Sequence, residues 1–161
     1  MLKEILTKAV VSKGKILDTQ DIYLDVKDNA NKAIGCWVIN HNYLSVVENN
    51  VLYASGFYDI HIWYAINDST DTQIYKTTID YKHEFEMDNK VNDLEKSEFK
   101  LYCIEYPTCS NLKLVNNQFV VTIKKGLAVD VIGESKLLVQ VSDTFANKED
   151  NMGINTNYLN K

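Results

Sequence analysis

The residues of this chain that could do chemistry are few, and its thiols come first. There are three cysteines, Cys36, Cys103 and Cys109. A catalytic cysteine needs a neighbouring base that lowers its pKa. Cys36 has only Gly35 and Trp37 beside it, so a base would have to come from elsewhere in the fold. The sequence therefore favours small buried thiols, and the odd number leaves at least one of them free.

Three histidines offer the next chemistry, which would be metal binding or general base catalysis. His61 lies two residues from Asp59, on the same strand face, as a metal pair or a base with its orienting carboxylate would. A zinc site needs three or four ligands at recognisable spacing, and neither HxH nor CxxC occurs. We interpret His61 as a structural histidine beside Trp63. We expect His41 to be hydrogen-bonded at a strand end, and His83 to be half-buried on an apolar face.

Other catalytic signatures are missing from the sequence. The six glycines are dispersed and form no phosphate-binding loop, and there is no GxSxG motif. Paired acids such as Glu84 and Glu86 fall on the charged side of a predicted strand, where exposed carboxylates are ordinary. We therefore expect a protein that is not an enzyme and that has no cofactor and no metal site.

Composition narrows the class of protein further. The chain has 161 residues, the length of one domain, and a net charge of −5 in which all 17 basic residues are lysine. The absence of arginine counts against nucleic-acid binding, which relies on its bidentate guanidinium. No apolar run reaches the roughly 18 residues of a membrane span, and the charged start of the chain has no cleavage site of a signal peptide. We expect a soluble intracellular domain in a reducing compartment.

The elements that must position these residues are strands, because the dominant periodicity is two. Apolar and charged residues alternate over Gln73–Glu86, and Tyr58 begins a similar apolar face over Phe57–Ile66. The turn-forming cluster Asn67–Asp71 separates the two runs, which predicts a long β-hairpin. A glycine within this region, Gly56, indicates a bulge or a close approach of the backbone.

A second hairpin and several shorter strands complete the pattern. Asn116 and Asn117 tolerate the positive φ of a type I′ turn, which would join strands at Asn111–Val115 and Gln118–Lys124. Gly133-Glu134 predicts a tight turn, and Pro107 the end of a strand. The further expected strands are Ala9–Lys13, Ile22–Val26, Ile34–His41, Val51–Ser55, Phe99–Tyr106, Leu127–Ile132 and Lys136–Val141.

These nine or ten strands predict an all-β fold, a single antiparallel β-sandwich or a barrel-like domain. A short N-terminal helix over Met1–Thr7 is compatible with its apolar spacing, and Asn89–Lys96 is expected to be a loop or a single helical turn. We expect a β-rich domain over 1–142 and a flexible polar tail over 143–161. The alternation is the same in a sandwich and in a barrel, so it does not distinguish them.

Aromatic residues are plentiful, with ten Tyr, five Phe and two Trp. Phe57, Trp63 or a face formed by Tyr102 and Tyr106 could belong to the core or pack against another copy of the chain. A ligand-binding module is the alternative, in which Trp37, Trp63 or Tyr64 would stack on the rings of a carbohydrate or peptidoglycan fragment. Rings that line a concave pocket would favour the ligand, and rings in a core or a subunit contact would favour assembly.

Five segments of the sequence resemble successive parts of one family, that of the outer spore coat morphogenetic protein CotE. They are Thr7–Gly14, Gly35–Tyr43, Gly56–Tyr64, Pro107–Cys109 and Leu127–Lys136. Their order and spacing agree with the family from about Ile5 to Val141, and their mixture of aromatic and polar residues is unusual enough to be specific.

The resemblance implies a non-enzymatic protein of endospore-forming bacteria, present in the mother-cell cytoplasm and then in the spore coat. Members self-associate, attach to the underlying coat layer and recruit other coat proteins, so the implied partners are further copies of the chain and other coat proteins. The matching positions are expected to serve the fold or assembly: Gly35, Trp37, Asn40, His41, Gly56, Tyr58, Asp59, Trp63, Tyr64, Pro107, Cys109, Gly133 and Glu134.

The sequence departs from the family pattern at two places. The second glycine of the family's Gly-Gly-Trp is Cys36 here, and the strongly acidic C-terminal tail of the family is replaced by a segment with three acids. Contacts that depend on an acidic tail are therefore in doubt for this chain. Oxidative cross-linking after the mother cell lyses stays open for Cys36, Cys103 and Cys109.

Overall fold

A computed structural model describes residues 2–140 of the chain, and they form long strands. The strands are β1 (Leu2–Asp25), β2 (Ala30–Glu48), β3 (Val51–Ile66), β4 (Asp71–Glu84), β5 (Glu86–Met87), β6 (Glu98–Val115) and β7 (Gln118–Gln140). A single 3₁₀ turn, Leu94–Lys96, lies in the predicted loop between β5 and β6. The predicted tail over 143–161 lies outside the described residues, and the domain assignment of 1–142 remains a prediction.

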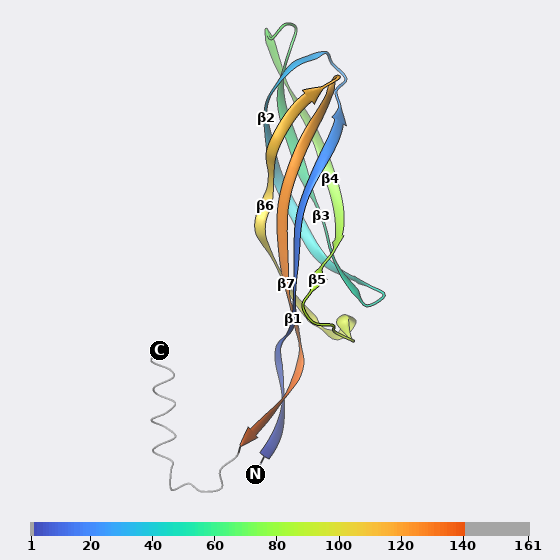
Figure 1. Cartoon of the computed structure of the whole chain (residues 1–161), viewed down its shortest axis with the longest axis vertical. Coiled ribbons are helices and arrows are strands. Elements are labelled where there is room, and N and C mark those ends of the chain that lie inside the picture. The colour runs from blue at the N-terminus through green and yellow to red at the C-terminus, as the bar shows by residue number, and fades with distance from the viewer. Residues whose placement is uncertain (1, 141–161) are drawn as a thin grey trace, which may run out of the picture. The chain divides into compact units, whose positions relative to one another are not determined.

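The strands form two antiparallel sheets, one in the order β5-β1-β7-β6 and the other in the order β2-β3-β4 (Figure 1). We call them the four-stranded and the three-stranded sheet. This confirms the predicted all-β fold, and two separate sheets correspond to a sandwich. None of the described segments forms an apolar helix long enough to cross a membrane.

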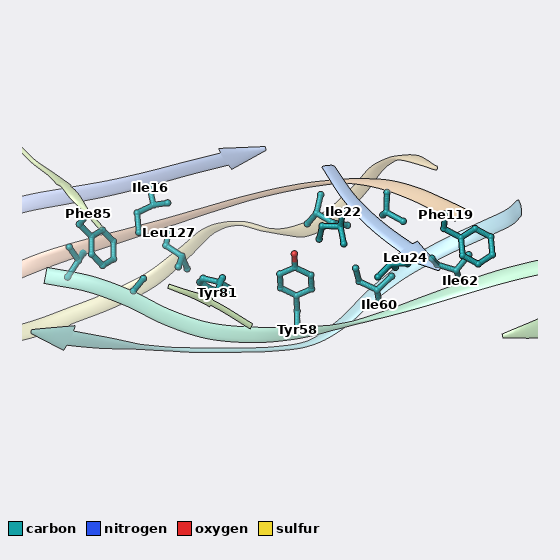
Figure 2. Close-up of a cluster of buried hydrophobic side chains, with 14 of the residues drawn as sticks. Ile16, Ile22, Leu24, Tyr58, Ile60, Ile62, Tyr81, Phe85, Phe119 and Leu127 are labelled. Atoms are coloured by element: carbon teal, nitrogen blue, oxygen red, sulfur yellow. The ribbon is translucent and has the colours of Figure 1, made fainter. Parts of the chain in front are cut away.

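The chain divides into two compact units, and each is described by itself. The larger unit, Val10–Gly133, contains the core between the two sheets. Figure 2 shows core side chains of both sheets pointing into the space between them, among them Ile16 of β1, Ile60 of β3 and Phe119 of β7. Their burial follows the period of two, since alternate residues of a strand share one face.

The second unit contains the two ends of the chain, of which residues 2–9 and 134–140 are described. The predicted N-terminal helix is wrong there, because Leu2 onwards belongs to β1. Ile5 and Leu6 are exposed, so a helix would bury no apolar face and would gain little stability. Pairing with β7 satisfies the backbone instead, and Lys136 Nζ lies 3.2 Å from Glu4 Oε1.

Both predicted hairpins are confirmed. β3 and β4 pair without interruption from Tyr53↔Glu84 to Ile66↔Asp71, and the turn between them has positive φ values. Asn116 and Asn117, with φ of 51° and 58°, join β6 to β7 as a type I′ turn requires. The same asparagine signal at Asn49-Asn50 joins β2 to β3, a hairpin that the sequence reading missed.

The predicted strand boundaries are often wrong, because several short predicted strands are parts of one long strand. Pro107 lies inside β6 and Gly133-Glu134 inside β7, so neither ends its strand. In β6 the pairing register with β7 shifts between Glu105 and Thr108, the segment that contains Pro107. This shift accounts for the break in alternation that predicted a strand end at Pro107.

Candidate functional site

The residues singled out by the sequence meet at a bulge in the middle of β2. The register with β3 shifts between Ile39 and Asn42, so that two residues of β2, Asn40 and His41, lie opposite a single residue of β3. Asn40 has a φ of 56°, in the left-handed region that asparagine tolerates better than most residues. The extra residue reverses the alternation of β2, so that His41 points inward. His41 therefore lies within a strand, and its predicted place at a strand end is wrong.

On the outward side of the bulge, Asp59 holds Asn40 in place. The Asn40 side-chain amide donates a hydrogen bond of 2.9 Å to Asp59 Oδ2, and the Thr78 hydroxyl donates one of 2.6 Å to Oδ1. These two hydrogen bonds keep the pKa of the Asp59 carboxyl below its usual value. Both Asp59 oxygens thus accept hydrogen bonds from β2 and β4, which agrees with our interpretation of His61 as a structural histidine and not as one half of a metal or catalytic pair.

On the inward side, His41 binds Tyr81 across the intervening strand. His41 Nε2 lies 2.6 Å from the hydroxyl of Tyr81, which comes from β4. Gly56 of the intervening β3 is paired with Tyr81 on one side and with Tyr43 of β2 on the other. A Cβ atom at Gly56 would lie 2.6 Å from the Tyr81 hydroxyl oxygen and closer still to the carbonyl oxygen of Asn42. Gly56 is therefore the predicted close approach, and it lets the tyrosine ring cross β3.

An ion pair from the four-stranded sheet, in which the lysine is buried, lies next to the Tyr81 ring. Lys125 is 1% exposed, and its Nζ lies 2.7 Å from Asp18 Oδ2. The ammonium also lies 4.7 Å from the centre of the Tyr81 ring, which is a cation–π contact. The His83 ring stacks on the Tyr81 ring, with the two ring centres 5.2 Å apart. We call His41, Tyr58, Tyr81, His83, Lys125 and Asp18 the inner cluster.

Burial and the lysine charge set the protonation of this cluster. Burial lowers the pKa of both His41 and His83, and the nearby Lys125 ammonium lowers each further. Burial, with a smaller contribution from the Asp18 carboxylate, raises the pKa of Tyr58 to about 12. The histidines are therefore neutral and Tyr58 is protonated near pH 7.

The inner cluster has the residue types of a catalytic site, and Tyr81 lines a hollow at the surface, but the two groups at its centre are inaccessible. Tyr58 is completely buried and Lys125 nearly so, which leaves no room for a substrate atom against either. Within the described residues, no group of three or more His, Cys, Asp or Glu is placed to hold a metal ion. The cluster can stabilise the packing of one sheet on the other, since each of its charged groups has a partner.

The outer face of the three-stranded sheet carries exposed apolar side chains. Trp37 and Trp63 pack edge to face with ring centres 5.5 Å apart, and they are 49% and 41% exposed. Gly35 lies opposite Trp63 in register and leaves room for the Trp37 ring, 3.7 Å from where its Cβ would be. We call the exposed apolar side chains of this surface the aromatic face: Trp37, Ile39, Leu44, Phe57, Trp63 and Ile74.

A hollow of about 650 Å³ lies on the same sheet beside the bulge. It is lined by Asn42, Tyr43, Leu44, Ser55, Gly56, Phe57, Asp80, Tyr81 and Lys82. Trp37 and Trp63 do not line it. Tyr64 is buried in the core, with its hydroxyl 3.1 Å from Asp28 Oδ2, so its predicted stacking on a sugar is wrong.

The three thiols lie at the boundary of the core and are unoxidised. Cys36 of β2 and Cys109 of β6 hydrogen-bond to each other, although they come from different sheets. Cys109 also donates to a backbone carbonyl, with its Sγ 3.2 Å from the Asn111 oxygen. Among the described residues, Cys103 bonds to backbone carbonyls alone, with its Sγ 3.3 Å from the Glu105 oxygen and 3.5 Å from the Gly126 oxygen.

Nine of the thirteen predicted positions lie on β2 and β3, the two strands that meet at the bulge. The other four lie on the other sheet, Pro107 and Cys109 on β6 and Gly133 and Glu134 on β7. Of these, Cys109 contacts Cys36 of β2, Pro107 is buried and Glu134 is exposed.

The sequence reading missed Lys125 and Asp18 of the inner cluster, although a signal for both existed. Lys125 occupies an inward position in the alternation of β7, where its neighbours Ile123 and Leu127 are fully buried. Asp18 likewise follows Ile16 at an inward position of β1. A charge at an apolar position of each strand predicts a buried pair, because a lone buried charge is too costly.

The two sheets, the inner cluster and the aromatic outer face define an all-β sandwich protein. A protein-family model described as outer spore coat protein E (CotE) matches residues 1–161, the whole chain. The chain therefore belongs to the CotE family and is a spore coat protein, as the sequence motifs predicted. Searches of curated proteins and of solved structures found no significant match.

Proposed function

We propose that this spore coat protein is a non-enzymatic morphogenetic component that associates with further copies of itself and recruits other outer coat proteins. It would do so in the mother-cell cytoplasm during sporulation and then remain in the coat. The aromatic face is the observation that carries the proposal. Family membership supports the coat location and a structural role.

The composition of the aromatic face fits a contact between proteins. Two tryptophans and a phenylalanine are each at least 40% exposed on one sheet, and aromatic residues are enriched in the cores of interfaces. Contiguous exposed apolar side chains on a folded surface indicate a partner. The Trp37–Trp63 pair is already ordered by its own contact, so little side-chain entropy remains to be lost on binding.

Polar groups on the same face are satisfied within the chain. Asp59 accepts hydrogen bonds from Asn40 and Thr78, so a partner could cover it without leaving a bare carboxylate. Lys82 and Glu48 form a 2.7 Å ion pair toward the edge of this surface. An apolar centre with a charged rim is the usual anatomy of a protein interface.

Strand edges offer a second contact. β4 is an edge strand of 14 residues, and β2 forms the opposite edge of the three-stranded sheet. Unpaired backbone groups of an edge can bind the edge of another chain. Charged residues on the outward side of β4, Lys76, Asp80 and Lys82, would restrict which edges can approach.

The hollow favours the alternative function, ligand binding. Phe57 lines it together with side chains that can hydrogen-bond, Asn42, Ser55 and Asp80, and a carbohydrate or peptidoglycan fragment needs both kinds of group. Trp37 and Trp63 lie outside the hollow, which is the reason we rank this function second. Titration with soluble peptidoglycan fragments, followed through tryptophan and tyrosine fluorescence, tests it directly.

Light scattering coupled to size exclusion tests self-association. The wild-type chain is expected to form defined oligomers at micromolar concentrations. The double variant Trp37→Ser, Trp63→Ser is expected to raise the dissociation constant of these oligomers at least tenfold. Tyr23→Ser, which removes a more exposed aromatic ring on β1, is the control and should leave the oligomers unchanged. A wild-type monomer at several hundred micromolar would overturn the proposal.

A further variant separates the aromatic face from the other candidate surface. Tyr102 and Tyr106 are exposed on β6 of the four-stranded sheet, and Tyr106 is the more exposed of the two. Loss of oligomers in Tyr106→Ser, with oligomers retained in the tryptophan variant, would assign the interface to β6 instead. Electron microscopy of the scattering peak would then give the symmetry of the assembly.

A further inference from the structure

We infer that Cys36 and Cys109 are a redox pair, which a peroxide converts into an intramolecular disulfide joining β2 of one sheet to β6 of the other. The inference does not depend on self-association. It rests on the placement of the two side chains, on the contrast with Cys103, and on the position of β2 and β6 in the sandwich.

Both side chains project into the sandwich from edge strands. Cys36 lies opposite Ile62 in the register of β2 with β3, and Cys109 lies opposite Ile123 in the register of β6 with β7. Residues directly opposite in an antiparallel pair share one face, and both isoleucines are fully buried. Each cysteine therefore sits on the inner face of its own sheet, packed against the core.

The edge strands that carry these cysteines lie side by side. β2 is the first strand of the three-stranded sheet and β6 the last of the four-stranded sheet, and they pack against each other (Figure 1). The Cys36 thiol reaches Cys109 across this contact and hydrogen-bonds to it. A disulfide needs two sulfurs brought together by facing backbones, and this contact supplies such a pair.

Cys103 shows that the pairing is specific. It lies on β6 like Cys109 and is also partly buried against the core. Its Sγ is engaged by the backbone oxygens of Glu105 and Gly126, and burial raises the pKa of its thiol. Cys103 is therefore a matched internal control with a similar location and no thiol partner among its contacts.

The hydrogen bond also divides the roles of the two thiols. The contact with Cys36 lowers the pKa of Cys109 to about 7, and the same contact together with burial raises the pKa of Cys36. The Cys109 thiol also donates a hydrogen bond to the backbone oxygen of Asn111, 3.2 Å from its Sγ. Thiolates are the nucleophiles of sulfur chemistry. Cys109 is therefore the attacking residue near neutral pH, and Cys36 is the resolving residue that keeps its proton until the second step.

The reaction with hydrogen peroxide balances in two steps. The Cys109 thiolate attacks one peroxide oxygen, the O–O bond breaks, and a sulfenic acid and hydroxide form. The Cys36 sulfur then attacks the sulfenic sulfur, the S–S bond forms, the S–O bond breaks, and water leaves with the thiol proton. Two thiols have lost two electrons to the peroxide, and after hydroxide takes up a proton the products are one disulfide and two waters.

The bond would close a long segment of chain. β3, β4 and β5 all lie between Cys36 and Cys109, so the cross-link restricts the unfolded chain strongly. We expect the melting temperature of the oxidised protein to exceed that of the reduced protein by about 10 °C. Comparison of the same chain before and after reduction needs no variant and therefore carries no risk of misfolding.

Thiol mapping of the full chain tests the pairing. The reduced protein is treated with hydrogen peroxide, the remaining thiols are blocked with N-ethylmaleimide, and the intact mass is measured. The expected product is a monomer that has lost two hydrogens and gained one maleimide, on Cys103. Cleavage after lysine leaves Cys103 and Cys109 on the same peptide, between Lys100 and Lys113, so peptide masses cannot distinguish these two cysteines. Cys103→Ser is therefore used to assign the bond, and it should form the same disulfide.

Two further variants make the test decisive. Cys36→Ser and Cys109→Ser should each lose the intramolecular disulfide and the oxidation-dependent rise in melting temperature, while circular dichroism of the reduced forms checks their fold. Maleimide on all three cysteines after peroxide, a disulfide-linked dimer, or a Cys103–Cys109 bond would each overturn the inference. A rate of disulfide formation that does not rise with pH around 7 would overturn the assigned roles.

Discussion

The two faces of the three-stranded sheet are both rich in aromatic residues, yet they are built in opposite ways. On the inner face, Tyr58 and Tyr81 are buried, and His41 and Lys125 fill the space around their rings. On the outer face, Trp37 and Trp63 touch each other and leave nearly half of their surface to solvent. Adjacent residues of the same strands supply both faces.

This difference separates two roles among the residues that the family motifs contain. The contacts with Tyr81 explain the glycine at position 56 and the histidine at position 41. Burial in the core explains the large ring of Tyr58, although the buried Tyr58 hydroxyl has no hydrogen-bond partner among the described residues. Trp37 and Trp63 have few such neighbours, and burial against the rest of the chain does not explain two large aromatic rings at these positions. Motif residues of the second kind are the ones to examine for partners.

The largest effect should come from breaking the buried ion pair. Asp18→Ala leaves the Lys125 ammonium buried without a countercharge, and we expect the free energy of unfolding to fall by about 3–5 kcal/mol. Urea denaturation measures this change. Asp21→Ala on the same strand, which removes only an exposed hydrogen bond from Thr122, should cost less than about 1 kcal/mol. Equal effects of the two variants would show that the inner cluster does not hold the sheets together.

The next largest effect should follow from adding a side chain at Gly56, where the Tyr81 ring crosses β3. Gly56→Ala places a methyl group against the Tyr81 hydroxyl and the Asn42 carbonyl, and we expect a loss of about 1–3 kcal/mol. Gly35→Ala is the matched control on the outer side, because its methyl group would meet Trp37 at an ordinary contact distance. The two melting temperatures measure the contrast, and a tolerated Gly56→Ala would mean that the ring of Tyr81 can move.

A smaller effect is expected from pH. His41 and His83 have pKa values below the ordinary 6.5, so the unfolded chain takes up protons before the native chain does. The contribution of the two histidines to the stability of the native state is therefore nearly complete at about pH 7.5, and it is lost as the pH falls through 6.5 to about 5.5. Urea denaturation at both pH values measures this change, and His41→Gln should reduce it. Equal stability at both values would contradict the assignment of neutral buried histidines.

The smallest effect on stability should come from the outer face. Trp63→Ser removes a ring that is 41% exposed and one edge-to-face contact, so we expect a loss of about 1 kcal/mol or less. The same variant should weaken self-association strongly, and light scattering with parallel denaturation separates the two quantities. A large loss of stability with unchanged association would place Trp63 in the fold and not in an interface.

Much of the three-stranded sheet could be predicted from alternation. The runs over Phe57–Ile66 and Gln73–Glu86 have one apolar face each, and those faces are the buried ones in β3 and β4. The turns at Asn67–Asp71 and Asn116-Asn117 were also predictable, because few residues adopt positive φ easily.

The strand lengths could not be predicted in the same way. A bulge keeps a strand in its sheet while it reverses the alternation, and in sequence it looks like an ending. His41 in β2 and Pro107 in β6 were both assigned to strand ends for this reason. Whether the chain turns or continues there depends on the partner strand, which local sequence does not specify.

The sequence by itself determined that this chain is an all-β member of the CotE family, because alternation, turn residues and motif order are local properties of the chain. Only the tertiary structure decided that Lys125 meets Asp18, that Tyr81 reaches His41 over Gly56, and that Cys36 faces Cys109. Each of these contacts joins residues from different strands, most of them far apart in sequence. Such contacts depend on register and on how one sheet packs against the other, and these are set by the burial of the whole core.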